Sequence, residues 1–585
     1  ATGISFQTSS DTIRLNGPVT LNSDVSFDTV NADVTFTNDA SIDGQAGENN
    51  GLTINAGTAS VLFNKNIGET LAVGNLVIER ADAGVFFGEA TAAMLDGTGP
   101  VNIINAAGGV NVGSVNEISG GIVLQPSGTT MQIISDGNDI RFNGDVDIRA
   151  TAVDITTGTG AGDIEFTQGL NAFLNDATNL DLTSGTGDIA FGGVLGSVGQ
   201  RFDNINIAQA NNVTVQGDVE ARSVTQQAGS GTTTFVGTVT TNDPSTAGIN
   251  LATSEVVFNG DVMTTGDARV IVDAGVTVNA DINTANGEIL FGQTTPGSAI
   301  TLADGTVLAT GGNADIRLRA VGDIRLSRLV TSSVDGLISV QSDAGAIIDN
   351  GDSGGADIVS RNVALRAATG IGDDGLADPA LNVAAADLPS ATDPKVEASA
   401  IDTQVEIIAA SNSTSGDIQI SNTVGGLLTI GTVDGLSGIT NDDDNDLDDT
   451  VADGPNGGVI WITNASPIDV SSQAAPNAAE GVRNSAGGSI ILTAVENAAP
   501  GDDLQVFAPI EATRGTGSLL LNAGDDLTLA SPLLTAIGST VTLRDRAGNI
   551  DLNAGNVLTI GNNSEVFDIQ TGSLFEEATS GADTS

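Results

Sequence analysis

Residues 501–552 read GDDLQVFAPIEATRGTGSLLLNAGDDLTLASPLLTAIGSTVTLRDRAGNIDL, a stretch that repeats itself. The motif Gly-Asp-Asp-Leu occurs twice, and Leu504, Leu527 and Ile550 follow one another at equal steps of 23 along the chain. Each of the three begins an apolar-polar-apolar triplet, which is the alternation of a half-buried β-strand. Such short strands cannot bury an apolar face alone, so their regular return predicts the stacked coils of a parallel β-solenoid.

Other parts of the chain keep the same period. Leu519 and Val541 form a second apolar row at a step of 22, and residues 314–350 align without a gap on residues 517–553. The motif Gly-Asp-Ile-x-Phe occurs at 162–166 and again at 187–191. Chance repetition in a chain rich in Gly, Asp and Thr does not account for a gapless match of four apolar rows. We therefore predict an all-β parallel β-helix with a coil period of about 22–25 residues.

Length then sets the number of coils rather than the number of globular domains. With one strand spacing per coil, 585 residues would give a rod on the order of 100 Å long. We expect regular coils over 1–350, coils with inserted Ala/Pro-rich and acidic loops over 351–467, further coils over 468–575, and a flexible tail over 576–585. The Ala-rich segment 380–388 is expected to form a short surface helix.

Phenylalanine marks the first half of the chain, with fourteen of the 17 at or before Phe291. Phe142, Phe166, Phe191 and Phe291 all occupy the second inward position of a strand triplet. We expect them to stack in successive coils and fill the core, because a ligand-binding aromatic row would have to face outward.

The chain is strongly acidic, with 73 acids against 19 bases and a net charge of −54. Nucleic acid and anionic membranes are therefore not expected partners. The charge suits solubility in a cation-rich medium, and it equally suits keeping a long β-rich rod from aggregating. No apolar run approaches the length that a transmembrane helix needs, so no membrane span is expected. Because the sequence starts at Ala1 and carries no signal peptide, we expect a processed product or a piece of a longer chain.

A family resemblance rests on three features: Gly370-Ile371-Gly372, the run LLTIGTVDG at 427–435, and the Gly-Asp-Ile-x-Leu/Phe coils. Together they resemble the repeats of very large bacterial exported proteins, the filamentous-haemagglutinin-like surface proteins. The resemblance implies a right-handed parallel β-helix and a location outside the cell or on its surface. It carries over no functional residues.

Catalytic chemistry has few candidates in this sequence. The absence of His and Cys excludes Ser-His-Asp and Cys-His machinery and imidazole zinc sites. Carboxylate-based polysaccharide lyases or hydrolases remain the alternative, because some parallel β-helices have that activity. The four arginines that cluster in the sequence are expected to pair with neighbouring aspartates rather than to line a groove: Arg317, Arg319, Arg325 and Arg328. We therefore predict a protein that is not an enzyme.

The acidic run 441–453 holds seven aspartates. Asp444, Asp446 and Asp448 have the 1, 3, 5 spacing of a calcium loop, but Asp449 stands where Gly is wanted and Pro455 where Glu is wanted. The run is therefore not an EF-hand. Weak Ca²⁺ binding and a simple solvated loop both remain open, and no other cofactor is predicted.

The function favoured by the sequence is a structural or adhesive component of a bacterial surface, fibre or matrix. Neither end reads as a polar cap, so end-to-end self-association, or neighbouring segments of a longer chain, should cover the terminal coils. Ile4 and Phe6 would lie at one junction, and Phe567, Ile569 and Phe575 at the other. Surface glycans are the other class of partner considered.

Overall fold

The described part of the chain is built of strands and turns, with one short 3-10 helix, η1 (Ala478–Glu480). The computed structural model describes residues 3–88, 101–126, 130–243, 247–331, 334–351, 353, 355–372, 400–423, 426–442, 458–495, 501–512, 517–535, 540–545, 550–551 and 566–571. Two compact units can be distinguished, residues 1–274 with 282–284, and residues 275–281 with 285–585. The predicted segment boundaries at 350, 467 and 575 stay predictions.

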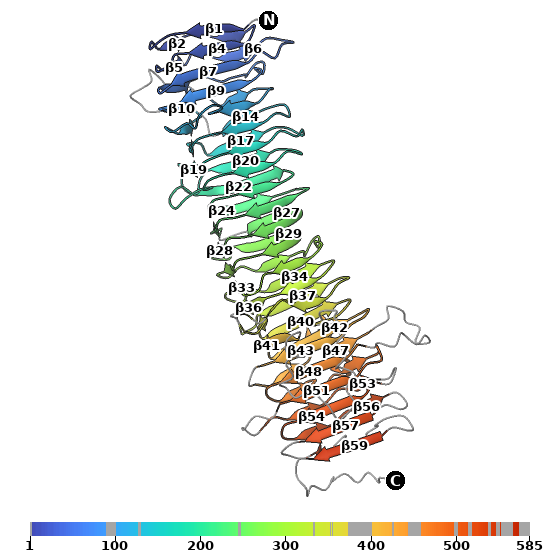
Figure 1. Cartoon of the computed structure of the whole chain (residues 1–585). Helices are drawn as coiled ribbons and strands as arrows, with labels where there is room; N and C mark the ends of the chain where they lie inside the picture. The colour runs from blue at the N-terminus through green and yellow to red at the C-terminus, as the bar shows by residue number, and fades with distance from the viewer. Residues whose placement is uncertain are drawn as a thin grey trace. The chain divides into compact units, whose positions relative to one another are not determined.

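The first unit has three faces of parallel strands that stack as successive rungs (Figure 1). The first face carries an inward ladder in which Phe142, Phe166 and Phe191 are in register, with stacked rings whose centroids are 5.4 Å apart. The predicted phenylalanine stack is therefore confirmed for these three, whereas Phe291 is fully buried as expected but pairs with Leu318 rather than with another phenylalanine. The strands of this face are β1 (Ile4–Gln7), β4 (Val25–Asp28), β7 (Leu52–Gly57), β9 (Leu76–Ala81), β12 (Val110–Val112), β15 (Ile140–Phe142), β18 (Ile164–Phe166), β21 (Ile189–Phe191), β23 (Val213–Val215), β25 (Thr232–Phe235) and the end of β27 (Ala247–Phe258).

The other two faces of the first unit complete each coil. The second face begins as a seven-stranded sheet of β2 (Ile13–Leu15), β5 (Val34–Phe36), β8 (Ser60–Phe63), β10 (Gly84–Phe87), β13 (Ile122–Leu124), β16 (Val146–Ile148) and β19 (Leu170–Ala172). Bridges through Leu195 lead from it to β24 (Val219–Gln226), β26 (Val239–Thr241), β28 (Val262–Thr264) and β30 (Ile282–Thr284). The third face holds β3 (Val19–Leu21), β6 (Ile42–Gly44), β11 (Ile103–Asn105), β14 (Thr130–Ile134), β17 (Ala152–Thr156), β20 (Asn179–Thr183) and β22 (Phe202–Gln209), followed by parts of β24 and β27.

The second unit repeats this design. One column of parallel strands runs through β29 (Arg269–Val278), β32 (Ile300–Leu302), β35 (Ile324–Leu326), β38 (Ile347–Asp349), β43 (Ile418–Asn422), β48 (Ile460–Asn464), β51 (Ile490–Ala494), β54 (Leu519–Ala523), β57 (Thr540–Asp545) and β59 (Val566–Thr571). A second column holds β31 (Ile289–Phe291), β34 (Ile316–Ala320), β37 (Leu337–Ser342), β40 (Asn362–Ala367), β42 (Ile407–Asn412), β47 (Ile439–Asn441), β50 (Val482–Asn484), β53 (Ile510–Ala512) and β56 (Leu533–Thr535). The remaining face consists of β33 (Val307–Thr310), β36 (Arg328–Thr331), β39 (Ile358–Val359) and β41 (Ile401–Gln404), and later of β44 (Leu428–Ile430), β49 (Ile468–Val470), β52 (Leu504–Val506), β55 (Leu527–Leu529) and β58 (Ile550–Asp551).

The predicted ladders are present in this unit. Leu504 pairs with Leu527, which pairs with Ile550, and Leu519 pairs with Val541. In the aligned stretch, Ile316 pairs with Ile338 and Ile324 with Ile347, as the gapless match requires. The all-β parallel β-helix is therefore confirmed.

Coil length departs from the period in the region where insertions were predicted. Ile347 pairs with Ile371 after one ordinary period. Ile371 then pairs with Ile418, and Ile418 with Ile460, and each of these steps is nearly twice as long. Extra residues are thus inserted within 351–467 while the strand register is kept. The predicted helix at 380–388 and most of the acidic run lie outside the described residues.

Polar residues inside the second unit are hydrogen-bonded along the stack. Asn412 donates to Asn441 at 3.0 Å, and Asn422 donates to Asn464 at 2.9 Å. All four side chains are almost fully buried, with exposed fractions of 0–2%. Burying an amide without hydrogen-bond partners would cost free energy of folding. Pairing along the stack therefore allows these asparagines, which end their strands, to be enclosed in the core.

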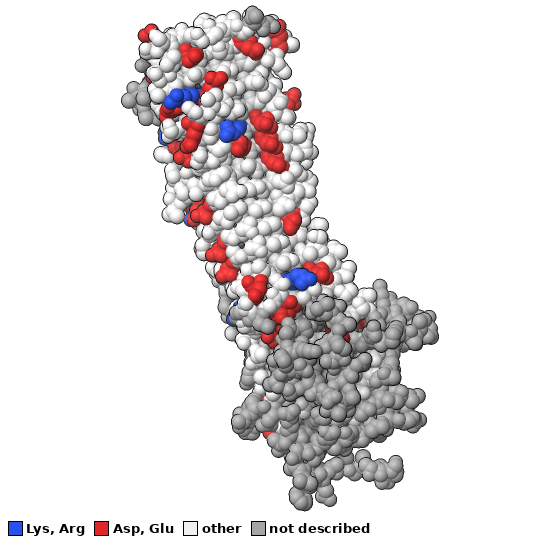
Figure 2. All heavy atoms as spheres, in the orientation of Figure 1, with Lys and Arg blue, Asp and Glu red and all other residues white. Residues whose placement is uncertain are grey.

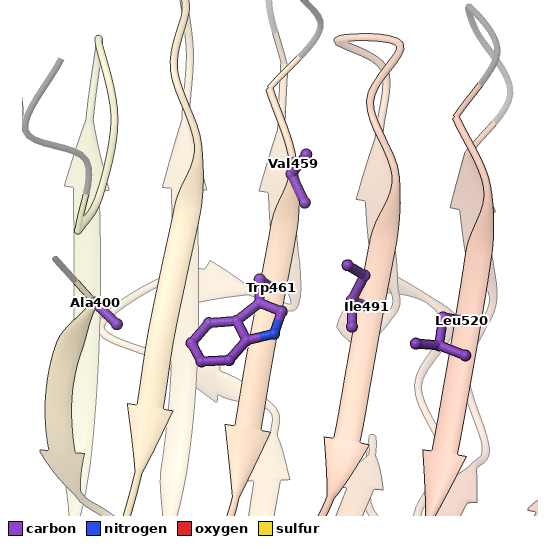
Figure 3. Packing of buried hydrophobic residues seen from close by; sticks show 5 residues of the cluster. All are labelled: Ala400, Val459, Trp461, Ile491 and Leu520. Carbon is purple, nitrogen blue, oxygen red and sulfur yellow. The ribbon is translucent and has the colours of Figure 1, made fainter. Parts of the chain in front are cut away.

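An outward-facing apolar row lies on the second-unit sheet, on the face opposite the solenoid core. Trp461, Ile491 and Leu520 are in register on the neighbouring strands β48, β51 and β54 (Figure 3). Successive side chains of a strand point to opposite faces, so this row lies on the other face from Ile460 and Ile462. The three side chains of the row are nevertheless only 2–6% exposed and cluster with Ala400 and Val459. This row is therefore packing rather than an open binding surface.

Candidate functional site

The strongest candidate for an interaction site is the first strand, β1. Ile4 and Phe6 sit in the register column of the core, paired with Val25 and Phe27 of β4, yet each is 50% exposed. The Phe6 ring stacks on Phe27 with centroids 5.3 Å apart, so one ring face is covered by the next coil. In an interior coil, such as that of Phe166, both ring faces are covered. Among the described residues, β1 pairs with β4 alone.

Within residues 3–88, the backbone of β1 is hydrogen-bonded to β4 along one side only. The N–H groups of Ile4 and Thr8 donate to the carbonyls of Asp24 and Asp28 at 2.8 and 2.9 Å. Because alternate residues of a parallel strand bond to opposite sides, the N–H of Ser5 points away from β4. An edge of this kind, with exposed apolar side chains and outward-pointing backbone groups, is a template for another parallel strand.

At the other predicted junction, Phe567 and Ile569 lie on β59. They are in register with Val541 and Leu543 of β57 and so continue the first column of the second unit. Phe575 lies outside the described residues. Both predicted junctions thus involve strands of the stacked columns.

The predicted calcium ligands Asp444, Asp446 and Asp448 lie outside the described residues, so calcium binding stays a prediction. Within the ranges that the structure describes, no group of three or more acidic side chains is placed to hold a metal ion.

Many aspartates have a structural role that the sequence did not reveal. The carboxylate of Asp139 accepts the N–H of Asp163 at 3.0 Å, and Asp163 in turn accepts the N–H of Asp188 at 2.8 Å. Asp188 accepts from Asn212 at 3.0 Å, and the Asn212 amide oxygen accepts from Thr232 at 2.9 Å. Each of these side chains therefore caps the backbone where the strand of the next coil begins. The same contact is made by Asp24, Asp145, Asp218, Asp323, Asp417 and Asp503.

The predicted pairing of arginines with aspartates is confirmed for two members of the cluster. Arg317 lies 3.2 Å from Asp315 and 3.0 Å from Asp434, and Arg319 lies 3.0 Å from Asp343. On the face shown in Figure 2, basic side chains likewise lie beside acidic ones and form no patch of their own among the described residues. Arg317 and Arg319 therefore act as intramolecular counter-ions.

The carboxyls of Asp154 and Asp469 have a raised pKa. Burial, with the charge of Asp503 adding to it, raises the pKa of Asp469 to about 6. Burial and the charge of Asp181 raise the pKa of Asp154, against a hydrogen bond from Gln132 that lowers it. Asp469 is only 8% exposed, and loss of solvent around its carboxylate is the main cause of the raised pKa.

No protein-family model, curated protein or solved structure matches this chain. Among the described residues, no helix has the length and hydrophobicity needed to cross a bilayer.

Proposed function

We propose that this chain is a non-enzymatic, extracellular structural or adhesive β-solenoid of a bacterial surface, fibre or matrix, joined end to end through its first coil. The observation that carries the proposal is that Ile4 and Phe6 lie in the core column of β1 and are half exposed. Either the last coil of another copy or a neighbouring segment of a longer chain would cover them, and we propose the former. The resemblance to filamentous-haemagglutinin-like exported proteins supports the surface location.

The backbone and side chains of β1 indicate which kind of strand would pair with it. A parallel strand with the same apolar-polar-apolar pattern would continue the hydrogen-bond ladder and cover the free face of Phe6. β59, with Phe567 and Ile569 in register with the ladder, has that pattern. Joining unlike ends is a heterologous contact, and without closure it produces a filament. Because both partners would be acidic, cations should strengthen the contact.

The proposal is tested by sedimentation velocity over a range of protein concentrations, with and without calcium. Ser5→Pro removes only the N–H that points away from β4, so the fold should persist while association is lost. Val198→Asp is the control, because Val198 is 85% exposed but lies on none of the strands. We expect wild type and V198D to associate and S5P to stay monomeric. Monomeric wild type under all conditions, or association of S5P equal to wild type, would contradict the proposal.

One observation favours the alternative of a polysaccharide-acting enzyme. The raised pKa of Asp469 beside Asp503 is the arrangement that a carboxylate pair would need for acid-base catalysis. A catalytic acid must reach its substrate, however, and Asp469 is 8% exposed. We therefore keep the non-enzymatic proposal. Release of new reducing or unsaturated ends from acidic polysaccharides by wild type, but not by Asp469→Asn, would overturn it.

A further inference from the structure

One hairpin leaves the coil path in the second unit. It consists of β45 (Thr432–Val433) and β46 (Leu436–Ser437), which are antiparallel and joined by Asp434 and Gly435. Both turn residues have positive φ, 50° and 77°, as a two-residue hairpin turn of type I′ requires. At its base the N–H of Gly438 donates to the carbonyl of Gly431 at 2.9 Å. The chain thus departs and returns at nearly the same point, so the hairpin is an addition to the coil.

The hairpin lies on the outer face of the second-unit sheet. Arg317, Ser339, Ala364 and Ala409 are successive members of one register column on β34, β37, β40 and β42. Their neighbours along each strand point into the core, so these four point outward. Ala364 and Ala409 are nevertheless fully buried, because they pack in a cluster with Val433 of the hairpin. Leu337, Ile407 and Leu436 pack against the same cluster.

The tip of the hairpin is held by hydrogen bonds to the other two members of that column. Arg317 donates to one carboxylate oxygen of Asp434 at 3.0 Å, and Ser339 donates to the other at 2.8 Å. Arg366 donates to the Asp434 carbonyl at 2.6 Å. Burial would raise the pKa of Asp434, but the hydrogen bonds from Arg317 and Ser339 and the two arginine charges hold it below its usual range.

The base of the hairpin is held from the other side. Thr432 donates to one carboxylate oxygen of Glu480 at 2.9 Å, and Ser471 donates to the other at 2.7 Å. Glu480 belongs to η1, which follows β49. A single short hairpin therefore contacts residues on four successive strands and is also hydrogen-bonded to η1, in the turn that follows β49.

This arrangement breaks the rule that governs solenoid stability. A coil normally contacts only its two neighbours, so coils can open one at a time from any weak point. Arg317 and Asp434 are 117 residues apart and join coils that are not neighbours. We propose that residues 432–437 form a brace that makes the coils containing β34, β37, β40 and β42 open as one cooperative unit. Cooperative opening would protect these coils from unfolding one at a time. The brace does not depend on how the ends of the chain associate.

Hydrogen exchange on the full chain, read by mass spectrometry of peptides covering β34 to β42, tests the proposal. Asp434→Asn weakens the tip contacts, and replacement of 432–437 by two glycines removes the hairpin while its base stays closed. The matched control is Arg319→Gln. Arg319 lies on the same strand as Arg317, but its salt bridge, at 3.0 Å, is with Asp343, which is not part of the hairpin. R319Q therefore removes a comparable ion pair and leaves the hairpin contacts in place.

In wild type we expect the amides of β34, β37, β40 and β42 to exchange at one common rate. In D434N and in the hairpin deletion, β34 and β37 should exchange about ten- to a hundredfold faster and no longer together with β40, since bonds to charged groups are lost. R319Q should accelerate exchange much less and keep the common rate. Unchanged exchange in D434N, or an equal effect of R319Q, would overturn the brace. If the deletion does not fold, the comparison of D434N with R319Q decides.

Discussion

Replacing Phe166 with alanine removes the middle ring of a three-ring stack. The side chain is fully buried, and the rings of Phe142 and Phe191 lie with their centroids 5.4 Å away on either side. A buried Phe→Ala change costs about 3–5 kcal/mol, and the loss of two stacked contacts places our expectation at the upper end, about 5 kcal/mol. Because the coils above and below are rigid strands held in register, they cannot collapse into the cavity.

The assay should read local as well as global stability, since a solenoid can open at one coil. We expect faster amide exchange in β15, β18 and β21 and a lower melting temperature for the first unit. Glu165→Ala is the control on the same strand, because the Glu165 side chain is 44% exposed and its 2.7 Å pair with Arg141 is worth about 0–1 kcal/mol. If F166A and E165A had the same exchange and melting behaviour, the stack would not be the core of this unit.

Three further predictions follow from the carboxylates. Asp163→Ala should destabilise the adjoining coils by about 1–2 kcal/mol in chemical denaturation, because the N–H of Asp188 loses its acceptor, whereas Asp163→Asn should be nearly neutral. Asp469→Asn should stabilise the protein above pH 6 by about 1–2 kcal/mol after solvent screening, and have little effect below pH 4. Because the pKa of Asp469 is raised in the folded state, its carboxyl favours folding most at low pH, and this contribution is lost as the pH rises through about 6. Equal pH dependence of the melting temperature in wild type and D469N would contradict this prediction. Millimolar calcium should protect residues 441–453 from proteolysis, and equal cleavage with calcium and with chelator would leave a solvated loop.

The repeating core could be predicted because each apolar ladder needs only one kind of information, the spacing of short alternating triplets. Leu504, Leu527 and Ile550 carry that spacing within one short stretch, and a register slip would turn every side chain to the wrong face. The phenylalanine stack follows from the same rule. The inserted residues within 351–467 were recognisable because the rhythm stops there.

The aspartate caps could not be derived in this way, although the Gly-Asp-Ile motif was visible. The carboxylate of Asp163 and the N–H that it caps lie in different coils, so they are not neighbours in sequence. The hairpin had a local signal, Asp434-Gly435 between apolar residues, which favours a two-residue turn. Its partners Arg317 and Arg366 lie 117 and 68 residues away, so the brace required the folded register.

The central claim, association through the open first coil, is tested most directly by negative-stain electron microscopy of the concentrated protein. Wild type should form unbranched filaments one solenoid wide that lengthen with concentration and with added calcium, while Ser5→Pro should show single particles. Uniform single particles of the wild-type protein at high concentration, with and without calcium, would contradict the account.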